Sequence, residues 1–152
     1  MRREKGRIKR YLGYTGLILV LFLTVFFFSR SKQNIKMFVM RNEEQLTAFA
    51  EDVLQNGAIG GIEEYKGYPV TKWASDSDGS VLLEFYHHGS GSVPNTSYFG
   101  FYYVPDDLPK TFQNAQGELW QSEDGWKWED DGDNWGYTEK ITDHWYYYEA
   151  HF

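Results

Sequence analysis

The sequence of 152 residues contains no cysteine. The chain therefore forms no disulfide, and it carries no cysteine to which a lipid anchor could be attached. Small exported domains often rely on disulfides because their cores are small. Aromatic side chains are the expected substitute here, since they make up 19% of the residues and lie mostly after residue 60. Each large ring can bury ~150–250 Å².

Basic residues are scarce after residue 41. Between Asn42 and Phe152 the sequence has five lysines and no arginine against 21 acidic residues, which gives a net charge of −16. Contacts with phosphate need Lys or Arg, so this balance argues against nucleic acid and against an anionic surface as partners. It favours a cationic partner or a divalent ion, although solubility alone would explain the same charge.

Motifs of known reactions are also lacking. No GxSxG sequence or other strand–turn–helix context for a nucleophile occurs, and no internal repeat is found. Paired carboxylates for glycoside cleavage always occur among 21 acids, but nothing in the sequence singles out one pair. We therefore expect a protein that is not an enzyme, with no catalytic residues.

One long uncharged apolar run, Tyr11–Phe28, is present. Eighteen helical residues rise about 27 Å, close to a hydrocarbon core of roughly 30 Å. A buried core helix would need a larger domain around it. A cleaved signal peptide would need small residues after the apolar core, where Phe26–Phe28 is followed by Ser29-Arg30-Ser31. The run predicts an uncleaved transmembrane signal anchor.

The charges beside this run predict its orientation. Residues 1–10 have a net charge of +5, whereas the basic residues of 29–41 are fewer and more spread out. The positive-inside rule then places residues 1–10 in the cytoplasm as a basic tail. Residues 29–41 become a juxtamembrane stalk, and residues 42–152 become an extracytoplasmic domain that is rich in aromatic and acidic residues. The predicted localisation is the cell membrane, crossed once.

The domain is predicted to begin with an amphipathic helix over Asn42–Asn56. Asn42 and Gln45 have the spacing of a capping box, and Gly57 suits a left-handed stop. Apolar residues recur at i, i+3, i+4, i+7 and i+8 along one helical face, namely at Leu46, Phe49, Ala50, Val53 and Leu54.

From Gly60 onward the pattern changes to short strands. Strands are predicted at Tyr68–Ala74, Val81–His87, Tyr98–Val104, Glu118–Glu123, Trp126–Asp130, Trp135–Ile141 and His144–Phe152. Gly89–Ser97 is expected to be a flexible loop, and Asp124-Gly125 a two-residue hairpin turn. The last strand should place Trp145 and Tyr147 on one face and Tyr146 and Tyr148 on the other. The predicted fold class is α+β: one helix packed on a curved antiparallel sheet of about six to eight short strands.

The tryptophans are the strongest candidates for a binding site. Exposed Trp and Tyr rings serve as platforms for sugars and as anchors for protein partners. Four tryptophans interleave with acids around a predicted hairpin: Trp120, Trp126, Trp128 and Trp135. Core packing is the competing role, and we expect two or three rings to be exposed.

Metal sites are a weaker hypothesis. Asp130, Asp131 and Asp133 share a Gly-containing loop that could hold Ca²⁺, although the spacing does not match an EF-hand. His87 and His88 are adjacent in a predicted strand, so their side chains are expected to point to opposite faces and not to share a metal.

The sequence thus predicts a membrane-anchored, non-catalytic binding domain of unidentified ligand, which could be a protein or a cell-surface component. One alternative is a module that binds cell-wall glycans through exposed Trp and Tyr rings. Another is an acidic inhibitor or immunity-type protein that blocks a basic toxin or hydrolase.

Overall fold

The computed structural model describes residues 14–24, 32–74, 79–113, 115 and 117–152. The chain divides into two units, Met1–Asn34 and Ile35–Phe152. In the first unit residues 14–24 are helical, and every large apolar side chain from Leu17 to Leu23 is exposed. Among the described residues no helix is both long and apolar enough to cross a membrane. The remainder of the predicted span, residues 11–13 and 25–28, lies outside the described ranges.

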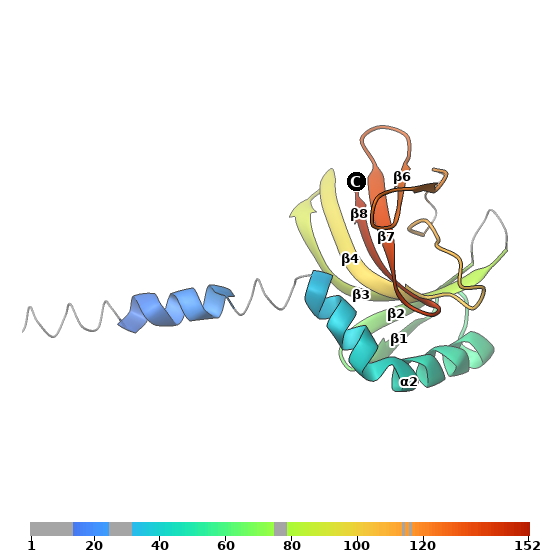
Figure 1. Cartoon of the computed structure of the whole chain (residues 1–152), viewed down its shortest axis with the longest axis horizontal. Helices are drawn as coiled ribbons and strands as arrows, with labels where there is room; N and C mark the ends of the chain where they lie inside the picture. The colour runs from blue at the N-terminus through green and yellow to red at the C-terminus, as the bar shows by residue number, and fades with distance from the viewer. Residues whose placement is uncertain (1–13, 25–31, 75–78, 114, 116) are drawn as a thin grey trace, which may run out of the picture. The chain divides into compact units, whose positions relative to one another are not determined.

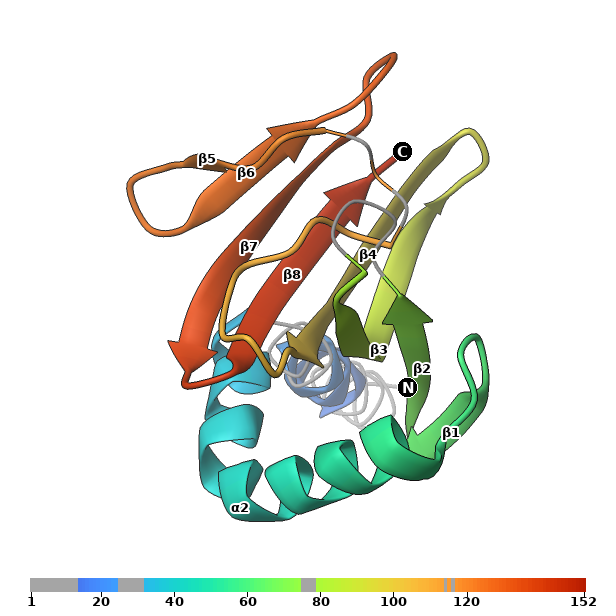
Figure 2. The same cartoon turned by 90° about the vertical axis from the view of Figure 1, so that its right-hand side faces the viewer.

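The second unit contains one antiparallel sheet of eight strands in the order β1-β2-β3-β4-β8-β7-β6-β5. After β4 the chain crosses to the far edge of the sheet and returns strand by strand until β8 pairs with β4. Figure 2 shows the curvature of this sheet, and the α+β class predicted for the domain is confirmed. The strands are β1 (Ile62–Tyr65), β2 (Tyr68–Ala74), β3 (Val81–Ser92), β4 (Asn95–Tyr103), β5 (Trp120–Gln121), β6 (Trp126–Glu129), β7 (Trp135–Thr142) and β8 (Trp145–His151).

The helix, α2 (Lys32–Asn56), begins ten residues before the predicted start. Residues assigned to a stalk therefore belong to the folded domain, where Ile35 and Val39 are fully buried. Asn42 is not a cap: it lies within the helix, and its side-chain amide donates to Phe38 O at 2.8 Å. Such side-chain contacts with the backbone accompany helix bends, and α2 bends part-way along its length (Figure 1).

The helix ends at Asn56, as predicted, but for a different reason. Gly57 does not adopt a left-handed φ; its N–H donates to Val53 O at 2.8 Å. Lys72 of β2 then caps the last turn, since its ammonium donates to Leu54 O at 2.5 Å and to Gly57 O at 3.0 Å. A cation at a helix C-terminus is favoured by the helix dipole.

The sheet has two covered faces. The helix face packs against α2 through a cluster that includes Phe85, Phe101, Trp145 and Tyr147. The opposite face, which we call the strap face, carries Tyr102, Trp128, Tyr146 and Tyr148. It lies under the strap, by which we mean the described residues 105–113, 115 and 117–119 between β4 and β5, which run across the sheet in Figure 2. The predicted alternation of β8 between the two faces is confirmed.

Two connections differ from the prediction. The predicted loop Gly89–Ser97 is mostly strand, because β3 and β4 continue to a tight turn at Val93-Pro94, which are joined by a cis peptide bond. The turn between β5 and β6 spans four residues, in which Ser122 N donates to Gly125 O at 2.7 Å. Edge strand β1 had no counterpart in the prediction.

Candidate functional site

A small pocket opens on the strap face between the sheet and the strap. Its cavity volume is about 10 Å³, which is close to what one water molecule needs. Counting its mouth, which is open to solvent, the space between the walls is about 270 Å³. Strands and strap both contribute to the lining: Leu82, Glu84, Tyr102, Lys110, Thr111, Phe112, Gln113, Trp128, Tyr137, Thr138 and Tyr148.

Glu84 is the carboxylate of this pocket and is only 7% exposed. Tyr148 donates its hydroxyl to Glu84 Oε1 at 2.8 Å, and Gln113 Nε2 donates to Oε2 at 3.3 Å. The indole N–H of Trp73 is near enough to favour the charged carboxylate, yet its geometry falls short of a hydrogen bond. Burial outweighs these donors and raises the pKa of Glu84 above its ordinary value.

Two glycines make the close packing of this face possible. Gly100 of β4 lies beneath the Tyr148 ring, where a Cβ would come within 2.2 Å of Phe85 O and 2.7 Å of the ring. This space lets Tyr148 cross β4 and reach Glu84 on β3. Gly136 likewise leaves the space that the Trp128 ring occupies, because a Cβ there would lie 2.3 Å from the indole.

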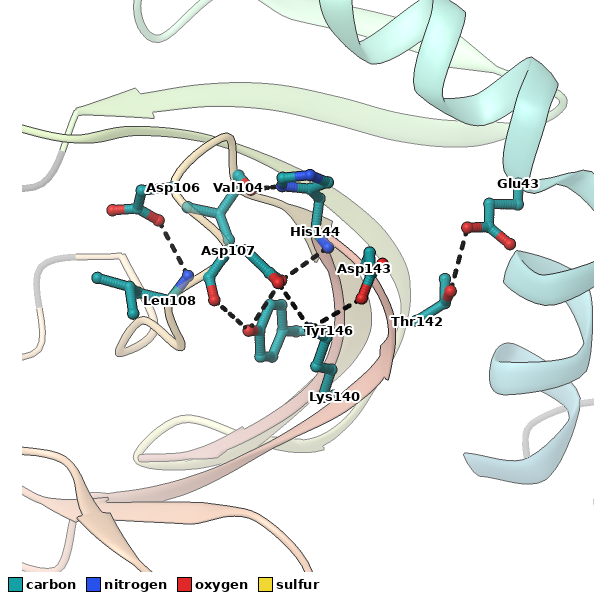
Figure 3. Close-up of polar contacts among 10 residues, drawn as sticks. All are labelled: Glu43, Val104, Asp106, Asp107, Leu108, Lys140, Thr142, Asp143, His144 and Tyr146. Atoms are coloured by element: carbon teal, nitrogen blue, oxygen red, sulfur yellow. Dashed lines mark hydrogen bonds and ion pairs between the residues drawn. The ribbon is translucent and has the colours of Figure 1, made fainter.

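The first part of the strap is fixed to the β7–β8 turn by Asp107 (Figure 3). Its Oδ1 accepts the backbone N–H of His144 at 2.8 Å, and its Oδ2 binds Lys140 Nζ at 2.6 Å. Tyr146 donates its hydroxyl to the Asp107 carbonyl at 2.7 Å. Asp107 and His144 both have positive φ, at 54° and 66°, so these contacts hold a backbone geometry that non-glycine residues rarely adopt.

The same contacts shift the pKa values of the groups involved. Partial burial would raise the pKa of Asp107, but hydrogen bonds from Lys140, His144 and Tyr146 outweigh it and the net pKa is lowered. Burial and the neighbouring Asp107 carboxylate raise the pKa of Tyr146 to about 12. This cluster therefore stays fixed in its charged form at neutral pH, which suits a structural anchor for the strap.

The four candidate tryptophans have different environments. Trp128 is 1% exposed and belongs to the core of the strap face, so it offers no platform. Trp126 is half-buried against Tyr146. Trp120 and Trp135 are 43% and 41% exposed. In the sheet, Trp120 pairs with Lys127 and Trp135 pairs with Glu129. Lys127 and Glu129 are two residues apart on β6, so their side chains and those of their partners point to the face opposite that of Trp128. Both exposed rings therefore lie on the helix face, outside its buried core.

Exposed acids and one exposed lysine lie near these two rings along the chain. We call the region the tryptophan edge: Trp120 and Trp135 with Lys127, which pairs with Trp120, and the exposed carboxylates of Glu118, Glu123, Asp124, Glu129, Asp131 and Asp133. Its residues belong to β5, β6, β7 and the chain beside them, at the end of the sheet that Figure 2 shows with these labels. Trp135 stacks on His151, with ring centroids 3.9 Å apart and planes tilted by 15°. His151 in turn shares a hydrogen bond of 2.8 Å with Ser97 Oγ.

The predicted metal ligands form a turn. Asp130 N donates to Asn134 O at 3.0 Å, and the Asp130 carboxylate accepts the N–H of Asp131 at 2.8 Å. Across the described parts of the chain, no three His, Cys, Asp or Glu side chains converge in a way that could hold a metal ion. The Ca²⁺ hypothesis for Asp130, Asp131 and Asp133 thus gains no support from their geometry.

The expectation that His87 and His88 point to opposite faces was wrong. A bulge shifts the β3–β4 register between Tyr86 and His88, and the two Nδ1 atoms lie 2.8 Å apart. A bulge inserts one extra residue, so the strict alternation of side chains fails there. His88 also stacks on Phe99, with ring centroids 4.7 Å apart.

Lysines of this unit are largely used inside it. Of the five that follow Asn42, four bind groups of the same domain. Lys66 binds Asn42 and Gln45, Lys72 caps the helix, Lys110 binds Asp106, and Lys140 binds Asp107 and Asp143. Lys36 of α2 likewise pairs with Glu139. The surface field is consequently dominated by carboxylates.

Sequence reasoning did not single out Glu84 or the strap. A signal for Glu84 was present, since it is the one charged residue among the apolar and aromatic residues of Val81–Tyr86, within the predicted strand Val81–His87. A charge in such a position is buried, and buried charges call for a partner or a function. The strap offered no comparable signal.

Comparisons of the chain with protein-family models, with curated proteins and with solved structures give no match.

Proposed function

We propose that this chain is a membrane-anchored, non-catalytic binding protein whose domain recognises a basic partner protein through the tryptophan edge. The observation that carries the proposal is two exposed tryptophans with six exposed acids against one exposed lysine, Lys127, in a domain whose other four lysines after Asn42 bind groups of the same domain. Trp rings are frequent interface anchors, and carboxylates around them attract and orient a cationic surface. An inhibitor or immunity-type role against a basic toxin or hydrolase is one form of this function.

The anchoring part of the proposal is supported by residues 14–24. Their helix exposes every large apolar side chain from Leu17 to Leu23, at exposed fractions between 42% and 66%. A contiguous apolar surface of this kind is unfavourable in water and favourable in lipid. With the basic tail of residues 1–10 in the cytoplasm, the domain lies outside the membrane.

The non-catalytic part is supported by the pocket. Within the described lining Glu84 is the single carboxylate, and Lys110, the single amine, is paired with Asp106 at 2.7 Å. General acid–base chemistry on a substrate needs groups that face the reacting atoms with room for the substrate. Here the single amine is already paired with Asp106 and the single carboxylate is held by Tyr148 and Gln113, so the pocket offers no pair of groups poised for proton transfer.

Capture by the full-length chain in detergent tests the binding proposal. We expect a basic protein to be retained at low salt and released at high salt, because screening weakens charge attraction. The double variant Trp135→Ala/Glu129→Gln should lose this capture. The matched control is Glu63→Gln/Glu64→Gln, which removes two exposed acids from β1, on the opposite edge of the sheet. Equal capture by both variants, or capture that salt does not change, would overturn the proposal.

Membrane topology can be tested with single-cysteine variants, because the sequence has no cysteine of its own that would react. A single cysteine at Val93, which is 89% exposed, should react with a membrane-impermeant maleimide added outside intact cells. A cysteine placed within residues 1–10 should react only after the cells are opened. The reverse pattern would contradict the predicted orientation.

Binding of cell-wall glycan is a second candidate, favoured by the stacking of Trp135 on His151. A ring held flat in this way could pack on a sugar face while Glu129 accepts hydrogen bonds from hydroxyls. Retention on purified cell wall at both salt concentrations, lost in Trp135→Ala, would support this candidate over the basic partner.

A further inference from the structure

We propose that the pocket at Glu84 binds a primary ammonium group, with the Glu84 carboxylate as its counter-ion and the surrounding aromatic rings as its walls. The Glu84 carboxylate, the size of the cavity and the rings around it support this assignment independently.

The carboxylate is buried, and the described groups that contact it are neutral. Tyr148, Gln113 and Trp73 approach it, and none of them carries a positive charge. Lys110 lines the pocket but directs its ammonium to Asp106 at 2.7 Å. An ionised carboxylate removed from water without a cation is costly. A cation from outside the domain would supply the missing charge.

The cavity accepts a compact head group. Its volume of about 10 Å³ suits one atom centre of the size of a water oxygen, and an –NH₃⁺ group is of that size. A guanidinium or a quaternary ammonium is larger and would not fit. The surrounding space includes open solvent, and Lys110, Thr111 and Gln113 of the strap are partly exposed lining residues, so an alkyl stem can extend outward.

The walls suit a cation. Tyr102, Phe112, Trp128 and Tyr148 all line the cavity with aromatic side chains. Their ring faces attract ammonium groups electrostatically, most strongly where water is excluded. Hydroxyl oxygens of Tyr102 and Thr138, 2.9 Å apart, offer further acceptors. Aromatic walls around a single carboxylate are the chemistry that recognises an amine.

Two sources could present this group: a free alkylamine, or a lysine side chain of a protein. Only the second rests on the proposed function, in which the partner is basic. The first would hold even if no such partner exists.

Titration of the full-length protein with n-butylammonium chloride, followed by calorimetry and tryptophan fluorescence at constant ionic strength, tests the inference. We expect saturable binding with a stoichiometry of one, and no binding of 1-butanol or sodium chloride. Glu84→Gln keeps the shape of the side chain and removes its charge, so binding should fall at least about 30-fold. The matched control Glu64→Gln, at an exposed position of β1, should bind as the wild type does.

Acid should also abolish binding, since protonated Glu84 has no charge to offer. The other titratable groups that line the pocket are Tyr148 from β8, Tyr102 from β4, Tyr137 from β7 and Lys110 from the strap. Burial raises the pKa of all three tyrosines, so they stay neutral when the pH falls below 7. Equal affinity in wild type and Glu84→Gln, or no saturable binding at pH 7 in a folded protein, would overturn the inference.

Two further experiments distinguish a free alkylamine from a lysine side chain as the ligand, and the amine site from the proposed binding of a basic partner. If Nα-acetyl-lysine amide binds and Nα-acetyl-Nε-acetyl-lysine amide does not, a lysine side chain is a sufficient ligand. Capture of the basic partner should then weaken in Glu84→Gln. Amine binding without any capture would sustain the pocket and reject the proposed function. Capture that Glu84→Gln leaves unchanged would limit the pocket to free amines.

Discussion

The two faces of the sheet are covered in different ways, and their chemistry differs accordingly. The helix face packs apolar groups against α2, whose backbone hydrogen bonds are made within the helix. The strap face packs against irregular chain, whose backbone groups need partners from elsewhere. Side chains of the sheet provide them: Tyr102 Oη accepts the Lys110 N–H at 2.8 Å, and Tyr146 Oη donates to the Asp107 carbonyl.

This contrast explains why two hydroxyls of the strap face, those of Tyr102 and Tyr146, bind backbone groups of the strap. It also isolates Glu84, because the hydrogen bonds to its carboxylate come from side chains and not from the backbone of the strap. The other polar groups of the strap face have a structural reason to be there. Glu84 accepts hydrogen bonds only from the neutral side chains of Tyr148 and Gln113, and this lack of a cation is why we base a ligand site on it.

Removing a ring from the helix face should have the largest effect. Phe101 is fully buried and stacks on Phe85 with ring centroids 4.7 Å apart. Phe101→Ala should lower the free energy of unfolding by about 3–5 kcal/mol. Tyr102→Phe on the strap face should cost only about 1–2 kcal/mol, since it removes one hydroxyl. Urea denaturation measures both, and a larger loss for Tyr102→Phe would reverse the ranking of the two faces.

Gly100→Ala tests the close packing of the Tyr148 ring against the backbone of β4 on the strap face. Its methyl group would collide with Phe85 O and with the Tyr148 ring, so we expect a loss of about 1–3 kcal/mol. Near-UV circular dichroism should report the displaced tyrosine. If stability and spectrum both stay at wild-type values, Tyr148 is not packed over β4 as described.

Asp107→Asn should loosen the strap. At pH 7 we expect a loss of roughly 1–2 kcal/mol, reduced because the side chain is partly exposed. The pKa of Asp107 is lowered in the folded state, so its stabilisation is present above the unfolded pKa and is lost as pH falls through the folded pKa. Variant and wild type should therefore converge in acid. Asp143→Asn, at a carboxylate whose side chain is 82% exposed, is the control and should change little.

Glu84→Gln should have the smallest effect on stability, with the opposite pH dependence. Burial raises the pKa of Glu84, so its contribution is greatest below the unfolded pKa and is lost as pH rises through the folded pKa. At pH 4 the free energy of unfolding of the variant should lie within about 1 kcal/mol of the wild-type value. As pH rises, the variant should become more stable relative to the wild type. Thermal unfolding across pH 4 to 8 measures this difference. A variant that becomes less stable than the wild type as pH rises would contradict the description of Glu84 as a buried charge.

Local patterns in the sequence predicted the sheet well where a strand is long and flanked by turns. Tyr68–Ala74 was placed at its observed bounds, and the alternation of β8 was assigned correctly. Edge strand β1 was missed because it is short, carries two glutamates and lies between glycines. The first ten residues of α2 were assigned to a stalk because they mix basic and apolar residues directly after the apolar run.

The candidate sites were less accessible from the sequence. The exposure of Trp120 and Trp135 follows from their register, and the burial of Trp128 follows from its register opposite Gly136, which no single-strand pattern shows. The pocket needs β3, β8 and the strap together. Those segments are far apart in the chain, and their contacts depend on the whole topology. The paired imidazoles of His87 and His88 depend on one bulge.

Lys72 has a consequence for how the domain opens. Its ammonium holds the carbonyls of Leu54 and Gly57, so the last turn of α2 cannot fray without releasing a side chain of β2. Helix ends usually exchange their amide hydrogens fastest. Here the amides at the end of α2 should exchange together with those of β2, as one cooperative unit, so that the helix and the sheet begin to separate in the same opening event.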